Sequence, residues 1–180
     1  MKKIAVIAFL SAFVAIPALA DNTGKAYVAA DYGQVNYTNV SLFPNPGMLR
    51  IAGGYHFTPS LAAEIGYSYF GDSIIQGPGG TATLSAASFQ VAVVSSLPLS
   101  KQFDLTVKLG MSNNSAKIVI TPSNLSANTT KNSVLYGVGA QYRVNAQFSV
   151  RAQYEYYGSF DDSSSPTTAA STSIGVVFDF

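Results

Sequence analysis

From Asp21 onward, apolar and polar positions alternate along the chain, in segments of roughly ten residues that are separated by turn residues. This alternation is typical of β-strands with one apolar face, and helical spacing nowhere lasts for more than a few residues. The fold class we predict is therefore all-β. The expected strands lie near Lys25–Tyr37, Met48–Phe57, Leu61–Gly71, Leu84–Leu97, Phe103–Ser112, Ser133–Arg143, Gln147–Gly158 and Ser171–Phe180.

The predicted connections alternate between short and long. The tight turns are Thr58–Ser60, Pro98–Gln102 and Val144–Ala146. The long polar loops are Thr38–Gly47, Asp72–Thr83, Asn113–Asn132 and Ser159–Ala170. This alternation is typical of an eight-stranded antiparallel up-and-down transmembrane β-barrel in a bacterial outer membrane, with turns in the periplasm and loops outside. An even strand count then returns the C-terminus to the periplasm, beside the N-terminus.

The chemistry of the two strand faces indicates which one points outward. A soluble barrel would need an exterior with roughly a quarter to a third charged residues, whereas only 11% of this chain is charged. The polar parity consists mostly of Gly, Ala, Ser and Gln, which suits the narrow lumen of a small barrel. We therefore expect the apolar parity to face lipid. Its Tyr and Phe residues lie near strand ends, where aromatic girdles form.

The first twenty residues form a separate segment. Lys2 and Lys3 precede the apolar run Ile4–Ile16, and small residues follow at Ala18 and Ala20. This is the pattern of a secretory signal peptide, so we expect cleavage after Ala20 and a barrel domain at residues 21–180. Eight basic side chains then remain against nine acidic ones, which gives no basis for nucleic-acid binding. With no cysteine in the chain, strand pairing must supply the stability.

Residues 53–67, Gly-Gly-Tyr-His-Phe-Thr-Pro-Ser-Leu-Ala-Ala-Glu-Ile-Gly-Tyr, resemble the second hairpin of the OmpA-type transmembrane domain. Residues 97–111, 142–156 and 173–180 resemble later parts of that family in the same order, whereas the long loops do not. The resemblance implies assembly by the barrel-assembly machinery, which recognises a final strand ending in an aromatic residue, here Val176, Phe178 and Phe180. Larger members add a peptidoglycan-binding domain, an activity not carried over to a sequence that stops at Phe180. Trp, common in the family's girdles, is absent.

The inward parity carries several ionisable or polar groups: Asp31, Glu64, Lys108, Gln141, Arg151 and Glu155. Glu64 and Arg151 lie at similar depths beyond their turns, so they can meet across the lumen, and the family resemblance implies the same pair. We interpret the group as an ionic network that fills the lumen; the alternative is a plug that rearranges and gates a small conductance. Val94 stands where family members have a switching Lys, which weakens the gate hypothesis.

Other candidates for chemistry are few. His56, the only histidine, lies beside a predicted periplasmic turn, the wrong end for the outer-leaflet chemistry of known lipid-modifying barrels. Asp161 and Asp162 resemble a cation site, but adjacent loop carboxylates are usually only solvated. We therefore predict no catalytic residue, metal or cofactor. Ala116–Thr121 is expected to extend the fifth strand beyond the membrane; the alternative is a local ribbon whose edge pairs with a partner.

Taken together, these features predict a non-enzymatic outer-membrane barrel with a structural or surface-interaction role. We expect a monomer surrounded by outer-membrane lipid and lipopolysaccharide, and any extracellular ligand would bind its loops. A narrow or gated porin-like channel is the alternative, and a lipid-modifying enzyme is third. The loops hold no pattern that names a receptor.

Overall fold

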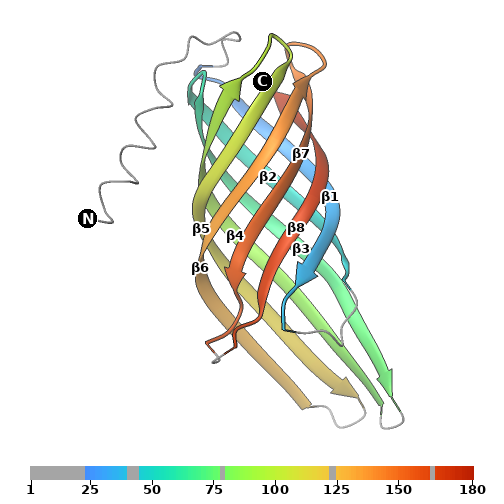
Figure 1. Cartoon of the computed structure of the whole chain (residues 1–180). Helices are drawn as coiled ribbons and strands as arrows, with labels where there is room; N and C mark the ends of the chain where they lie inside the picture. The colour runs from blue at the N-terminus through green and yellow to red at the C-terminus, as the bar shows by residue number, and fades with distance from the viewer. Residues whose placement is uncertain (1–22, 40–44, 78–79, 122–124, 163–164) are drawn as a thin grey trace, which may run out of the picture.

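The computed structural model describes residues 23–39, 45–77, 80–121, 125–162 and 165–180, and these form a closed antiparallel barrel of eight strands (Figure 1). Each strand pairs with the next, and β1 pairs with β8 to close the barrel, which confirms the predicted fold. The predicted signal peptide lies outside the described residues. Within those residues no helix is long and apolar enough to cross a membrane. The strands are β1 (Ala26–Tyr37), β2 (Gly47–Thr58), β3 (Leu61–Gly77), β4 (Gly80–Pro98), β5 (Phe103–Thr121), β6 (Leu125–Arg143), β7 (Phe148–Ser159) and β8 (Thr168–Asp179).

The two ends of the barrel differ. Residues 59–60, 99–102 and 144–147 connect strands at what we call the turn end, at the top of Figure 1. Side chains stabilise these turns; the Asn145 carboxamide oxygen, for example, accepts hydrogen bonds from the backbone N–H groups of Gln147 (2.9 Å) and Phe148 (2.8 Å). β1 begins and β8 ends here as well. We call the opposite end the hairpin end.

The strands have two lengths. β1, β2, β7 and β8 have 12 residues each, whereas β3 has 17 and β4, β5 and β6 have 19. At about 3.3 Å per residue and a tilt near 40°, the shorter strands rise about 30 Å, close to the apolar band of about 25 Å in outer-membrane barrels. The longer strands rise nearly 50 Å by the same reckoning. β3–β6 therefore project beyond the other four strands at the hairpin end (Figure 1). We call the projecting residues 72–77, 80–87, 113–121 and 125–132 the extension.

The structure corrects two of the predicted loops, because most of their residues belong to the strands of the extension. Asp72–Thr83 and Asn113–Asn132 were expected to be long polar loops, yet the ladders run on through Ile74↔Thr83 and Val119↔Ser126 almost to the hairpin tips. The sequence-based boundaries stopped where a membrane-spanning strand is long enough, but β-branched residues continue to favour strand beyond that point. The prediction that Ala116–Thr121 extends the fifth strand is confirmed. Residues 38–46 and 160–167 do connect strands, as expected.

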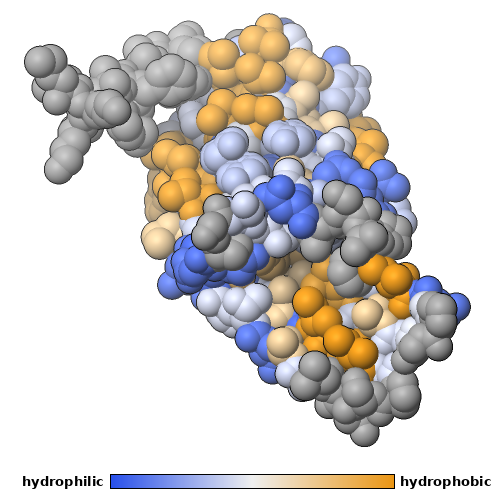
Figure 2. All heavy atoms as spheres, turned by 60° about the horizontal axis from the view of Figure 1, so that its bottom comes forward, coloured by the Kyte–Doolittle hydropathy of each residue, from blue (hydrophilic) through white to orange (hydrophobic). Residues whose placement is uncertain are grey.

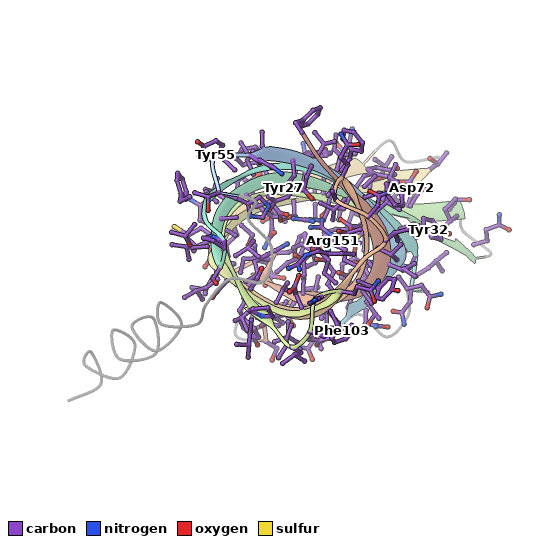
Figure 3. All side chains as sticks on the ribbon, turned by 90° about the horizontal axis from the view of Figure 1, so that it is seen from above. Tyr27, Tyr32, Tyr55, Asp72, Phe103 and Arg151 are labelled. Atoms are coloured by element: carbon purple, nitrogen blue, oxygen red, sulfur yellow. The ribbon has the colours of Figure 1, made fainter. Side chains whose placement is uncertain are left out.

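The predicted polarity of the barrel wall is confirmed. Large apolar side chains such as Tyr32, Met111 and Ile174 are exposed on the outer surface. Charged and small polar side chains of the opposite parity are buried inside. Figure 3 looks along the barrel, with Tyr55 and Phe103 outside the ring of strands and Tyr27 and Arg151 within it. The functional groups of the barrel are thus shielded by its own wall.

Candidate functional site

Six ionised side chains fill the middle of the lumen. This ionic layer combines three carboxylates with three cations, so its net charge is zero, and every member is less than a tenth exposed. The members come from five strands, β1, β2, β3, β5 and β7. Because a buried charge without a partner is strongly unfavourable, each group here has to be matched by the others. The residues are Asp31, Arg50, Glu64, Lys108, Arg151 and Glu155.

Arg151 forms a two-pronged contact with Asp31. Its Nε donates to Oδ1 at 2.7 Å and its Nη2 donates to Oδ2 at 2.6 Å. Its remaining terminal nitrogen, Nη1, donates to Glu64 Oε2 at 3.0 Å. The flat guanidinium group therefore joins β7 to β1 and β3 across the lumen, a geometry that a lysine could not reproduce.

Arg50 is the centre of the layer and was missed by the sequence reasoning. Its Nη1 donates to Asp31 Oδ2 at 3.0 Å, and its Nη2 donates to Glu64. Its Nε donates to Gln90 Oε1 at 3.0 Å and lies 3.5 Å from Glu155 Oε2. A signal was available, because a charged residue between Leu49 and Ile51 in an alternating strand must point inward.

Lys108 links the two glutamates. Its Nζ lies 2.7 Å from Glu64 Oε1 and also donates to Glu155. Two tyrosines also donate hydrogen bonds to these carboxylates. The Tyr27 hydroxyl donates to Glu64 Oε2 at 3.0 Å, and the Tyr157 hydroxyl donates to Glu155 Oε2 at 2.9 Å. Such complete hydrogen bonding makes an interior charge network tolerable.

One glycine makes room for this network. A Cβ at Gly54 would lie 2.2 Å from the ring carbon Cζ of Tyr27, far inside contact distance. The Tyr27 ring can therefore lie across β2 and reach Glu64 only because position 54 has no side chain. This explains in steric terms why a glycine of the second predicted hairpin occupies an inward position.

The sequence-predicted lumen residues divide into two groups. The structure brings Asp31, Glu64, Lys108, Arg151 and Glu155 together in the ionic layer. Gln141 lies instead beside a small cavity at the turn end. The alternation along each strand identified the inward face for all six residues. Their depth along the lumen depends on how far each strand is displaced against its neighbours. The distance from the nearest turn predicted a similar depth only for Glu64 and Arg151.

The turn-end cavity has a volume of about 40 Å³, and Val94 and Gln141 are among the residues that line it. His56 Nε2 lies 3.3 Å from Asp179 Oδ1 at its rim, and Arg143 is paired with Asp104. This volume has room for a few water molecules, which need roughly 10–15 Å³ each, but it ends at the ionic layer. His56 is thus a polar side chain at the turn end of the lumen.

An apolar plug closes the other side of the ionic layer. The sequence predicts a polar lumen, and that holds for its middle and its turn end. On the hairpin side of the ionic layer the interior is instead packed with large hydrophobic rings and chains. Phe70 is fully buried and meets the rings of Tyr157 and Phe160 edge-on, with centroids 5.1 Å and 6.0 Å apart. The plug comprises Val35, Met48, Phe70, Leu135, Tyr157 and Phe160, with Tyr37 packed against it.

Two further predicted features lie outside the lumen. Val176 and Phe178 lie on the outer face of β8, and Phe180, which directly follows the strand, is exposed as well; the ring centroids of Phe178 and Phe180 are 5.4 Å apart. At the hairpin end, Lys131 pairs with the Asp162 carboxylate, while an Asp161 carboxylate oxygen accepts the Thr167 backbone N–H at 3.0 Å. Within the described residues no cluster of three or more His, Cys, Asp or Glu could hold a metal ion.

Solved structures with the same fold include small bacterial outer-membrane proteins. The attachment invasion locus protein Ail of Yersinia pestis, solved with the heparin analogue sucrose octasulfate, is 18% identical, with 88% of this chain and 99% of that chain covered and a TM-score of 0.62. Neisserial surface protein A is 18% identical, with 86% and 97% covered and a TM-score of 0.65. OprG of Pseudomonas aeruginosa is 11% identical, with 91% and 99% covered and a TM-score of 0.62.

Two further comparisons use the sequence, and one of them finds a match. The search of curated proteins finds no match to the chain. A family model described as the outer membrane protein beta-barrel domain matches residues 5–180, which includes every strand of the barrel. With the closed eight-stranded barrel, its lipid-compatible exterior and its charged interior described above, this match shows that the chain belongs to the outer membrane protein beta-barrel domain family.

Proposed function

We propose that this protein is a non-enzymatic membrane platform whose filled barrel anchors the extension at the cell surface. The observation that carries the proposal is the double closure of the lumen by the ionic layer and the apolar plug. An eight-stranded barrel has room for side chains and little else, and here that room is occupied over both layers. The wall then serves to hold the hairpin end in place.

The orientation of the barrel is part of this proposal. Short turns face the periplasm and long connections face outward in known outer-membrane barrels, which favours an external hairpin end and periplasmic ends of β1 and β8. On this reading lipid and lipopolysaccharide surround the apolar belt of a monomer. Val176, Phe178 and Phe180 then end β8 where the barrel-assembly machinery would recognise it.

Cysteine labelling tests the orientation directly, because the natural chain has no cysteine. Single variants Thr121→Cys in the extension and Ser100→Cys at the turn end are treated in intact cells with a membrane-impermeant maleimide. We expect label on Thr121→Cys only, and on both after lysis. Label on Ser100→Cys alone in intact cells would reverse the orientation, and the natural chain is the unlabelled control.

The closure of the lumen is tested by planar-bilayer recording of the refolded protein. We expect no reproducible single-channel steps, because a conducting path would have to cross both closed layers. A gated pore is the second candidate, favoured by the way Lys108 is shared between Glu64 and Glu155, which is an arrangement that can exchange partners. Steps that change in the Arg151→Ala variant would support that gate and contradict the closed platform.

A surface-interaction role draws support from two observations. The extension carries a structured surface beyond the membrane band, and proteins of the same fold include one named for attachment and invasion and one named a surface protein. A gene deletion tests the role. Reduced binding of cells to surfaces without membrane leakage would support it, whereas altered acylation of outer-membrane lipids would point to an enzyme instead.

A further inference from the structure

The extension reverses the polarity of the barrel wall. Phe89, Asn113 and Asn132 form a row of residues paired in register. On the turn-end side of this row, the outward positions are apolar. Beyond that row most outward positions are polar: Thr81, Thr83, Ser85, Ser115, Lys117, Ser126, Asn128 and Thr130, with Ala87 and Val119 as apolar exceptions. Most positions that continue the lumen parity are apolar, and we call these the inner face: Ile75, Ala82, Leu84, Ala86, Ala116, Ile118, Ile120 and Ala127. The polar residues Asn114, Thr129 and Lys131 share this parity, and their side chains donate hydrogen bonds to backbone carbonyls of residues 157–161.

The register proves that the inner face continues the lumen side. The β4–β5 and β5–β6 ladders run without a shift from the barrel into the extension, so Ile118 and Ile120 share the parity of Lys108 in the ionic layer. In β3 a bulge between Phe70 and Ser73 shifts the alternation by one residue. Ile75, opposite Ala82, is thereby turned to the inner face, while Ile74 is left outside.

This inner face is partly open. Ile118 and Ile120 are each 38% exposed, although residues of the same parity in the closed part of the barrel, such as Lys108, are buried. Figure 2, with the hairpin end turned forward, shows hydrophobic side chains gathered beside the hairpin tips. The face is partly open because β1, β2, β7 and β8 end closer to the turn end, so that within the described residues no strand lies opposite Ile118 and Ile120.

At its base the inner face merges with the apolar plug. Ala86 belongs to the same packed cluster as Phe70 and Phe160, and Ala116 packs against it. The backbone of the inner strands is already paired within the sheet, so the surface offers carbon and few hydrogen-bonding groups. An occupant would therefore have to be apolar where it makes contact.

We propose that the inner face binds a small amphipathic molecule, which lays a hydrocarbon chain or ring against the exposed side chains of Ile118 and Ile120. From Ala86 to Ala82 the face is about 13 Å long and its four strands are about 14 Å across, which suits a medium-length alkyl chain. A patch of this kind covers a few hundred Å², well below the roughly 800 Å² that each partner gives to a stable protein interface.

Two other occupants fit the geometry less well. A second copy in the same membrane stands parallel to the first, and each inner face points toward its own barrel axis, so the lower walls of both barrels would separate the two faces. Lipid of the surrounding membrane contacts the outward side of the wall. The ligand therefore arrives from the aqueous side, with its polar head in water.

The natural chain contains no tryptophan, which allows a local reporter. We would place Ile120→Trp on the inner face and, as the matched control, Val119→Trp on the opposite side of the same strand at the same height. Each barrel is reconstituted in lipid nanodiscs and titrated with a brominated medium-chain fatty acid, which quenches tryptophan fluorescence on contact. Quencher that merely enters the lipid affects both reporters alike.

We expect saturable quenching of the Ile120→Trp variant, half-complete at a roughly tenfold lower concentration than for Val119→Trp. Adding Ile118→Asp to the Ile120→Trp variant should raise that concentration to the level of the control. Equal, unsaturable quenching of both reporters would overturn the proposal. Migration before and after boiling verifies that each variant is folded, and the result is independent of whether the lumen conducts.

Discussion

The extension continues four of the eight strands of the barrel wall, yet the two regions present opposite faces to their surroundings. In the wall, Val91 and Met111 face outward and Gln90 and Lys108 face inward. In the extension the polar side chains face outward and Ile118 faces inward. Both regions alternate with a period of two residues, and they differ only in whether the apolar positions face outward or inward. The solvent on the outside, hydrocarbon for the wall and water for the extension, accounts for the inversion.

The comparison also separates two ways of filling an interior. The wall closes on itself, so charged groups inside it must be matched by one another, and the ionic layer does so with net charge zero. The extension is an open sheet, so its apolar side stays partly in contact with water. Substitutions should therefore be severe in the wall and mild at equivalent places in the extension.

The largest effect is expected for Glu64→Ala. This carboxylate contacts Arg50, Lys108 and Arg151, and its removal leaves three buried cations facing two carboxylates. Loss of one partner from a buried charge network destabilises by about 3–5 kcal/mol. The free energy of unfolding in urea, measured in lipid vesicles, checks this value.

A double variant, Glu64→Ala with Lys108→Met, serves as the control because it restores equal numbers of positive and negative charges. We expect it to lose less stability than the sum of its two single variants. Strict additivity would show that the charges do not depend on one another.

Large-to-small substitutions of aliphatic side chains compare the plug with the inner face. Leu135→Ala, at a fully buried position of the plug, should lower the free energy of unfolding by about 2–5 kcal/mol. Ile118→Ala should lower it by only about 1 kcal/mol or less, because that side chain is already partly in contact with water. Equal losses in urea titrations would mean that the inner face is covered by something in the native protein.

Charge substitutions on the outer surface locate the boundary of the hydrocarbon. Val93→Lys, in the middle of the outward belt of β4, should destabilise by about 2–4 kcal/mol. Thr83→Lys, on the outward side of the same strand within the extension, should change stability by no more than about 0.5 kcal/mol. A large loss at position 83 would place the extension inside the membrane.

Among the substitutions in the barrel wall, the smallest effect is expected at Gly158, near the end of β7. Gly158 has φ of +76°, and a Cβ there would lie 2.4 Å from the Cβ of Ser133. Gly158→Ala should therefore destabilise by about 1–3 kcal/mol. Gly77→Ala in the extension, where a Cβ would meet no atom within 4 Å, is the matched control and should be close to neutral. Thermal unfolding in detergent compares the two.

The alternation of residue types by itself determined the fold class, the eight strands, the tight turns and the side of the wall that meets lipid. These follow from local chemistry, because a strand in hydrocarbon must be apolar on one parity and the lumen admits only small or matched polar groups. It also identified five of the six members of the ionic layer, by parity alone. Arg50 could have been found in the same way.

Tertiary structure decided what depends on how far each strand is displaced against its neighbours. Stagger sets the depth of each inward side chain, so it brings Arg50 to Asp31 and Glu64, leaves Gln141 at the turn end, and stacks Phe70 against Tyr157. It also leaves β3–β6 projecting beyond the other strands at the hairpin end. There the alternation continues, but most apolar side chains face inward and most polar ones outward. Alternation records only which face a residue occupies, whereas depth and closure arise from pairing between strands that are distant in the sequence.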